Sequence, residues 1–229
     1  MEKSLSVVIP TILKNVSVLL KLLNILNHDD SVDEIIIINN SLDKNLYLSG
    51  SKIKIHTPEQ NLYVNKSWNL GVSLAKNENV LIMNDDILCV DNFCTCVLKT
   101  RILEKEDTGL VGIDNCFIKN YDRENTANID RPELTTDLEI RFYPLNRDFK
   151  TGDWGSAFFF KKKNWYNIPE DLKILYGDNY ILKKNMENNK INYRISGAPF
   201  NHIHSLSSGD SKFKDTVIDD IAKSHAYFD

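Results

Sequence analysis

Three short apolar segments in the first 90 residues, each followed by polar residues, are the feature that most limits how this chain can fold. Residues 4–9, 34–38 and 79–83 read SLSVVI, EIIII and NVLIM. Segments this short and this apolar are typical of strands that are buried on both faces of a parallel sheet. The polar residues that follow them would meet at one edge, where such sheets bind ligands.

The residues between these strands predict helices and one further strand. Residues 16–26 carry leucines at helical spacing, and Asn15 stands where a helix cap is expected. Residues 65–76 predict a second helix, and residues 52–56 a short alternating strand. The order β-α-β-β-α-β predicts an α/β fold with a mostly parallel, doubly wound sheet flanked by helices.

The second half is less regular. Its predicted strands and helices cover residues 91–104 (helix), 109–117 (strand), 154–160 (strand), 177–188 (helix), 191–195 (strand) and 215–227 (helix). A polar segment, residues 118–150, is a candidate lid, and residues 200–211 predict a polar loop. We expect one domain over residues 1–229, with a nucleotide-binding half (1–100) and an acceptor-binding half (101–229).

Composition excludes several classes of function. The net charge is −4, which argues against nucleic acid as the main partner. No apolar run reaches the ~18 residues that span a bilayer, and the first residues do not resemble a signal peptide. The chain has no paired CxxC spacing of the kind that forms zinc sites, and Cys94-x-Cys96 alone is a weak signal. The four cysteines are best interpreted as reduced thiols of a cytoplasmic protein.

Asn84, Asp85 and Asp86 directly follow a strongly apolar predicted strand, residues 79–83. Adjacent carboxylates repel each other unless a cation lies beside them, and a hard divalent cation takes carboxylate and phosphate oxygens as ligands. The triplet therefore favours a metal site. The alternative is a turn or helix cap, because Asn and Asp favour both.

Four ordered segments resemble the motifs of glycosyltransferase family two: residues 6–11 (SVVIPT), 34–41 (EIIIINNS), 69–75 (NLGVSLA) and 80–86 (VLIMNDD). The resemblance covers roughly the first hundred residues well and the rest loosely. It implies the GT-A fold and an inverting transfer from a nucleotide-diphosphate sugar, commonly a UDP-sugar, with Mn²⁺ or Mg²⁺. The chain looks like the small single-domain members of bacteria and large DNA viruses, so the expected location is the cytoplasm, or the host cytoplasm.

By resemblance, two groups of residues would hold the donor. Pro10, Thr11, Asn39 and Asn40 belong to the matching motifs and would line the nucleotide pocket, whereas Lys66 is a candidate for the diphosphate by its charge alone. The family usually has Asp where Asn39 stands and often an aromatic residue near Leu13, so the identity of the base stays open.

The DxD motif of the family corresponds to Asn84-Asp85-Asp86, with Asn in place of the first Asp. Asp86 is the implied metal ligand, and Asn84 and Asp85 would contact the ribose or the metal through water. The arginines at positions 123, 131, 141 and 147 are further candidates for the diphosphate.

The acceptor side resembles the family at Tyr176-Gly177-Asp178-Asn179. Asp178 is the implied base that takes the proton of the acceptor hydroxyl, and Asn179 replaces a second acid. Asp153 is the rival base, and the alternative for Asp178 is a helix cap. Trp154 either stacks on a sugar or packs in the core.

His202 and His204 are candidates for completing the metal shell, because a neutral imidazole is a common metal ligand. We prefer His204, since serines that could hold phosphate oxygens follow it. A pair of ordinary surface histidines is the alternative.

Two other functions compete with transfer. A sugar nucleotidyltransferase would carry a glycine-rich phosphate loop after the first strand, and residues 10–14 (PTILK) contain no glycine. A catalytically inactive nucleotide-sugar or glycan-binding module is favoured by the Asn residues at 84 and 179. For the transferase, the predicted partners are a nucleotide-sugar donor and a glycan or other hydroxyl acceptor.

Overall fold

In the computed structural model, the described residues are 4–113, 129, 132, 139–145, 155–203 and 211–228. The helices are α1 (Val16–His28), α2 (Asn65–Leu74), α3 (Phe93–Lys99), α4 (Gly177–Glu187) and α5 (Lys214–Phe228). The strands are β1 (Leu5–Thr11), β2 (Val32–Asn39), β3 (Ile53–His56), β4 (Asn79–Met83), β5 (Ile87–Cys89), β6 (Thr108–Ile113), β7 (Arg141–Pro144), β8 (Ala157–Lys161), β9 (Ile191–Ser196) and β10 (Phe200–His202).

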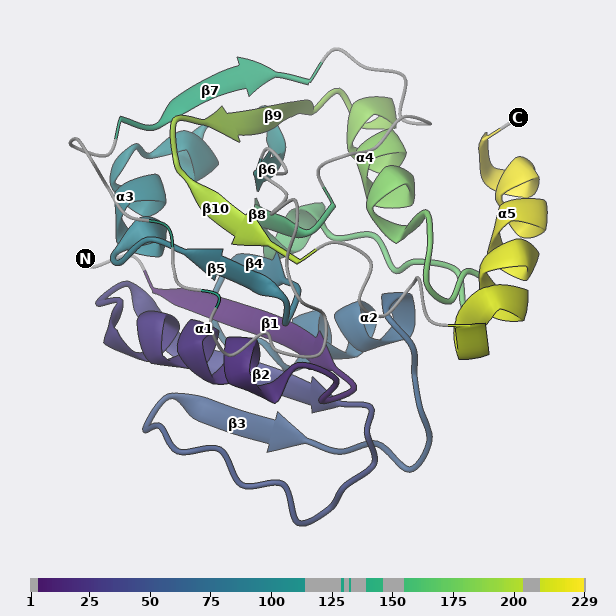
Figure 1. Cartoon of the computed structure of the whole chain (residues 1–229). Helices are drawn as coiled ribbons and strands as arrows, with labels where there is room; N and C mark the ends of the chain where they lie inside the picture. Colours follow the sequence, from purple (N-terminus) through teal and green to yellow (C-terminus); the bar gives the residue numbers. More distant parts are fainter. Residues whose placement is uncertain are drawn as a thin grey trace.

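Eight strands form one sheet in the order β3-β2-β1-β4-β8-β6-β9-β7 (Figure 1). The first four are parallel, β8 is antiparallel to both of its neighbours, and β7 is antiparallel to β9. Six strands therefore run one way and two the other, which confirms the predicted α/β architecture with a mostly parallel sheet. The carboxyl ends of β1, β2 and β4 all reach the same edge.

Alternate residues of β1 face two separate cores. Val7 and Ile9 pack with α1 and α3 on one face of the sheet, and Val8 packs with α2 and α4 on the other. The strand is buried on both faces because helices cover both, as its apolar sequence predicts. The helix cap predicted at Asn15 is confirmed, since its side chain accepts a hydrogen bond from Val18 N.

The motif at Asn69 and Gly71 serves packing in this chain. A Cβ at Gly71 would lie 2.1 Å from Val8 Cγ1. Glycine at position 71 therefore lets α2 lie closer to β1 than any side chain there would allow. The Asn69 amide donates to Ile168 O (2.9 Å) and accepts from Ile168 N (3.0 Å). This segment therefore fixes α2 against the sheet and against the chain that leads to α4.

Three predicted elements differ from the structure. The helix predicted over residues 91–104 breaks after α3, because Arg101 has a left-handed backbone (φ 62°) and a 3₁₀ turn, Ile102–Glu104, follows. The predicted loop over residues 200–211 begins instead with strand β10, which pairs with β5 as a separate two-stranded sheet. The strand predicted over residues 109–117 begins at Thr108, and its last four residues lie outside the described ranges.

Across the described ranges, no helix is both long and apolar enough to cross a bilayer.

Candidate functional site

The ends of β1 and β4 bring Thr11 and Asp85 together, although they are 74 residues apart in the chain. Thr11 Oγ1 donates a hydrogen bond to Asp85 Oδ2 over 2.5 Å, and Leu13 N donates to Thr11 Oγ1 over 2.9 Å. Leu13 has φ 58°, a conformation uncommon for a residue with a large side chain. This tight turn after β1 holds the hydroxyl against the carboxylate.

Left-handed non-glycine residues recur in the loops at this edge. Leu13 follows β1, Leu42 follows β2, Tyr63 precedes α2 and Tyr176 precedes α4, with φ between 58° and 66°. Such conformations cost free energy and gather where a structure needs an unusual backbone path, functional sites among them. Asn92, Arg101 and Asn189 adopt the same conformation elsewhere in the described ranges, so the four at this edge agree with a ligand site there without identifying it.

Asp85 lies in a strongly perturbed electrostatic environment. Burial raises the pKa of Asp85 to about 7, and the neighbouring charge of Asp86 adds to the rise, while the hydrogen bond from Thr11 opposes it. Asp85 keeps some exposed surface, but protein atoms make up most of its surroundings. The two carboxylates therefore share one region of low dielectric.

The pairing of β5 with β10 places His202 beside Asp86. His202 lies opposite Ile87 in the register, and Ile203 N donates to Asp86 O over 3.0 Å. The two side chains are 8% and 10% exposed, and His202 Nε2 lies 3.3 Å from Asp86 Oδ1. Although close, this contact does not meet hydrogen-bond geometry, so Asp86 Oδ1 is buried without a hydrogen bond.

These atoms fit a divalent cation. A buried carboxylate oxygen without a hydrogen bond, next to an imidazole nitrogen, offers the oxygen and nitrogen donors that Mn²⁺ accepts. Within the described part of the chain, no group of three or more His, Cys, Asp or Glu residues is arranged to hold a metal by itself. Any cation here would need further ligands from a substrate or water, which suits a site that binds a diphosphate.

Asp178 lies near the same edge of the sheet, against the residues that lead into β8. Asn84 N donates to Ser156 O over 2.9 Å. The residue before Ser156, Gly155, lies directly against the Asp178 carboxylate. A Cβ at Gly155 would lie 1.9 Å from Asp178 Oδ2, so only glycine leaves room for this carboxylate. Asp178 therefore lies near Asn84 through Gly155 and Ser156, the two residues that precede β8.

Asp178 lies in the first turn of α4, after Tyr176 in the cap position. It is therefore not the cap itself, although a carboxylate there also interacts favourably with the helix dipole. Burial raises the pKa of Asp178, and the N–H groups of Asn179 and Asp178 oppose the rise. A carboxylate with a raised pKa is a stronger proton acceptor than an ordinary surface Asp.

Asn39 and Asn40 point into the protein. Asn39 Nδ2 donates to Asp43 O (2.9 Å) and Thr57 Oγ1 (3.1 Å), and its Oδ1 accepts from Ser41 N and Oγ. Asn40 Nδ2 donates to Ser67 Oγ (2.8 Å), and its Oδ1 accepts from Leu62 N (2.9 Å). Both amides hold loops in place, so their polar atoms are already engaged.

The remaining predicted residues are divided between the surface, the sheet and undescribed parts of the chain. Pro10 is buried in β1 opposite Ile38, and Lys66 forms a surface ion pair with Glu170 (3.1 Å). Arg141 forms an exposed ion pair with Glu139. The predictions that lie outside the described residues concern Asp153, Trp154, His204 and the arginines at 123, 131 and 147.

The position of His202 beside Asp86 depends on strand β10, which the sequence analysis did not predict. The alternation in Phe200-Asn201-His202-Ile203 was the available signal, since Phe200 and Ile203 are buried in the core.

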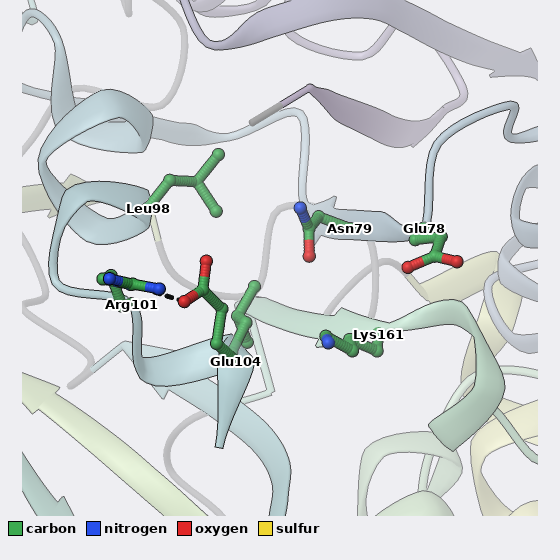
Figure 2. Close-up of a pocket in the computed structure, with 7 residues that line it drawn as sticks. Glu78, Asn79, Leu98, Arg101, Glu104 and Lys161 are labelled. Carbon is green, nitrogen blue, oxygen red and sulfur yellow. Dashed lines mark hydrogen bonds and ion pairs between the residues drawn. The ribbon is translucent and has the colours of Figure 1, made fainter. Parts of the chain in front are cut away.

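A separate pocket of about 160 Å³ lies elsewhere, near the start of β4 (Figure 2). Its lining includes Glu78, Asn79, Arg101, Glu104 and Lys161, and Arg101 and Glu104 pair with each other at 2.5 Å. It lies at the amino end of β4, away from Asp85 and Asp86, and its charged groups are of both signs.

No family model matches the chain, and no curated protein matches it. Solved structures of S. aureus TarS are similar in fold. The structure of TarS residues 1–349 has a TM-score of 0.61 and 18% identity, covering 87% of this chain and 60% of that one. The same fragment in complex with UDP has a TM-score of 0.61 and 17% identity, covering 94% and 65%.

The TarS fragment in complex with UDP-GlcNAc has a TM-score of 0.59 and 16% identity, covering 89% of this chain and 59% of that one. The chain thus spans less than two thirds of these structures. The likeness establishes the fold alone, which is the GT-A fold expected from the sequence.

Proposed function

We propose that this chain is a glycosyltransferase that moves a sugar, with inversion, from a nucleoside-diphosphate donor to a hydroxyl acceptor. The observation that carries the proposal is the convergence of Asp86, His202 and Asp178 at one edge of a GT-A-type sheet. UDP-sugars are the proposed donors, because TarS, with the same fold, forms complexes with UDP and UDP-GlcNAc.

In this proposal, Asp86 and His202 hold a divalent cation, Mn²⁺ or Mg²⁺. When bound, the cation neutralises charge on the departing diphosphate. Thr11, Asn84 and Asp85 line the nucleotide side. Asn39 and Asn40 shape the walls of this pocket through the loops that they hold, and do not read the base themselves.

Asp178 acts as the base. The acceptor oxygen attacks the anomeric carbon, its proton passes to the Asp178 carboxylate, and the bond between that carbon and the diphosphate oxygen breaks. The bonding electrons leave with the diphosphate. Attack from the face opposite the leaving group inverts the anomeric configuration, so base and leaving group must lie on opposite sides.

A donor screen tests the proposal. UDP-, GDP- and dTDP-sugars are incubated with the protein in Mn²⁺, in Mg²⁺ and in chelator, and release of the nucleoside diphosphate is measured. We expect metal-dependent release of UDP, lost in Asp86→Asn and kept in Asp33→Asn, an exposed residue of β2. Absence of binding to every donor, with and without metal, would contradict the proposal.

A second candidate is a binding module without turnover. It is favoured by Asn84 and Asn179, which stand where the related motifs carry acids, and Asn179 is buried in α4. Measurements on Asp178→Asn and on the unmodified protein distinguish the two candidates. Loss of transfer with unchanged UDP binding supports the enzyme, whereas metal-dependent binding with no turnover of any donor in the unmodified protein supports the module.

A further inference from the structure

Asp220, on the C-terminal helix α5, binds one short loop through three consecutive backbone groups. Its carboxylate accepts hydrogen bonds from Lys173 N (2.9 Å), Ile174 N (2.6 Å) and Leu175 N (2.8 Å). Asp220 is fully buried. A buried carboxylate is tolerated only where hydrogen bonds or charges replace its water, so these three N–H groups are what hold it there.

The same loop, residues 172–175, is held from its other side by the start of α2. Asn65 Nδ2 donates to Leu172 O (3.1 Å) and Leu175 O (2.9 Å). Val64 N and Asn65 N both donate to Lys173 O over 3.0 Å. The loop therefore has its N–H groups bound by α5 and its carbonyl groups bound by α2, which leaves its backbone little freedom.

This loop leads directly into Asp178. Tyr176 follows in a left-handed conformation (φ 63°), and Gly177 packs so tightly that a Cβ there would lie 2.1 Å from Asn65 Oδ1. Asp178 comes next, already confined by Gly155. Only two residues, Tyr176 and Gly177, separate the loop from Asp178, and both are confined, so a shift of the loop moves Asp178.

The end of α5 strengthens the same attachment. Phe228 packs on Tyr176 with ring centroids 5.8 Å apart, and Tyr227 meets Tyr180 of α4 edge to face, also at 5.8 Å. Lys183 Nζ donates to Tyr227 O over 2.5 Å. Figure 1 shows α5 outside the sheet layers, on the side of α4 and α2. The Tyr227 hydroxyl also donates to Asp171 Oδ1 over 2.7 Å, just before the loop.

We propose that Asp220 is a positioning residue that sets the place of the Asp178 carboxylate by binding the 172–175 loop. The inference rests on the proposed function, in which Asp178 is the base. It gives α5 a role in turnover although Asp220 itself touches neither donor nor acceptor. Because the loop lies on the acceptor side, losing its anchor lowers kcat and leaves donor binding unchanged.

Asp220→Asn is the first test, because the amide keeps the shape but turns an NH₂ group toward backbone N–H donors. Misplacing a reactive group by about 1 Å can cost roughly 100-fold in rate. We expect kcat to fall about 10- to 100-fold, with the Kd for UDP in Mn²⁺ changed less than about twofold. Amide hydrogen exchange at residues 173–175 should become faster. Asp219→Asn is the matched control, since Asp219 is the adjacent residue and pairs with Lys223 on the surface.

A double variant separates positioning from general loosening. If Asp220 acts through Asp178, then adding Asp220→Asn to Asp178→Asn lowers residual transfer no further. Equal losses in both backgrounds, or a UDP Kd that rises as much as kcat falls, would overturn the inference. So would unchanged kcat or unchanged exchange at residues 173–175 in Asp220→Asn.

If Asp220→Asn does not fold, Asp220→Glu keeps the charge and displaces it by one methylene, with the same expected split between kcat and UDP affinity. Failure of the proposed function looks different. In that case the unmodified protein transfers no sugar, or Asp178→Asn keeps full activity, and the inference falls with it. If wild-type transfer depends on Asp178 but not on Asp220, the inference on Asp220 is overturned and the proposed function stands.

Discussion

In the proposed glycosyltransferase, the nucleotide side and the acceptor side of the site are built in different ways. On the nucleotide side, Thr11 ends β1, Asn39 ends β2 and Asp85 lies just after β4, and the parallel register of these strands brings them to one edge. On the acceptor side, Asp178 is placed by Gly155, Asn65 and Asp220, which come from three distant parts of the chain. The first arrangement is a property of regular strands, and the second depends on single side chains.

The comparison teaches where each side is vulnerable. The ends of these strands are held in place by the hydrogen bonds of the whole sheet. A substitution there therefore alters mainly the side chain that is replaced. A carboxylate that is placed by close packing and by a clamped loop can be displaced by a change that never touches it. Substitutions outside the reacting groups should therefore act mostly on Asp178.

The largest effect is expected from Gly155→Ala. The new Cβ would lie 1.9 Å from Asp178 Oδ2, so the carboxylate has to move, and kcat should fall about 100-fold while UDP binding is kept. Steady-state kinetics and UDP titration measure the two quantities. Gly109→Ala is the control, because its Cβ meets Asn192 Oδ1 at 2.5 Å, away from the catalytic edge. Equal losses of kcat in both variants would show that crowding alone is responsible.

Asn39→Asp tests the claim that the nucleotide side is built internally. The carboxylate would replace the amide that donates to Asp43 O, leaving two acceptors face to face in a buried position. We expect the free energy of unfolding to drop by roughly 1–3 kcal/mol, measured by urea denaturation. The preference among donor bases should stay the same. A changed preference would mean that residue 39 reads the base after all.

His202→Ala should weaken Mn²⁺ binding in the presence of UDP by at least about tenfold, since groups around a metal site contribute on that scale. Calorimetric titration with Mn²⁺ measures the loss, and His56→Ala, an exposed residue of β3, is the control. His204→Ala decides between the two histidines. If it removes Mn²⁺ affinity and His202→Ala does not, the ligand is His204.

The smallest effect is a pH-dependent gain in stability from Asp178→Asn. Burial raises the pKa of Asp178 in the folded state, so ionisation disfavours folding. Its stabilising contribution is therefore complete below the ordinary carboxyl pKa of about 3.9 and is lost as the pH rises through the folded value. Thermal unfolding should show the variant with a higher midpoint than the wild type at pH 8, and a difference that shrinks toward pH 4. A difference independent of pH would reject this cause.

Much of the fold could be predicted because the buried face of each helix or strand imposes a periodic pattern of apolar residues on the sequence. The segments that form β1, β2 and β4 are mostly apolar, since helices cover both faces of the sheet. Asp85 and Asp86 were predictable for the same reason, as they follow the last buried residue of β4. Strand β10 was missed because only three residues pair, next to polar positions that resemble a loop.

The sequence by itself determined the α/β architecture, the edge that carries the site and the acidic group at the end of β4. Only the tertiary structure decided that His202 lies beside Asp86, that Asn39 faces inward, and that Asp220 holds the loop before Asp178. The physical reason is that periodicity reports how each segment is buried, one segment at a time. Which hydrogen-bond partner a polar side chain meets depends on packing between segments, such as the 45 residues that separate Asp220 from Leu175.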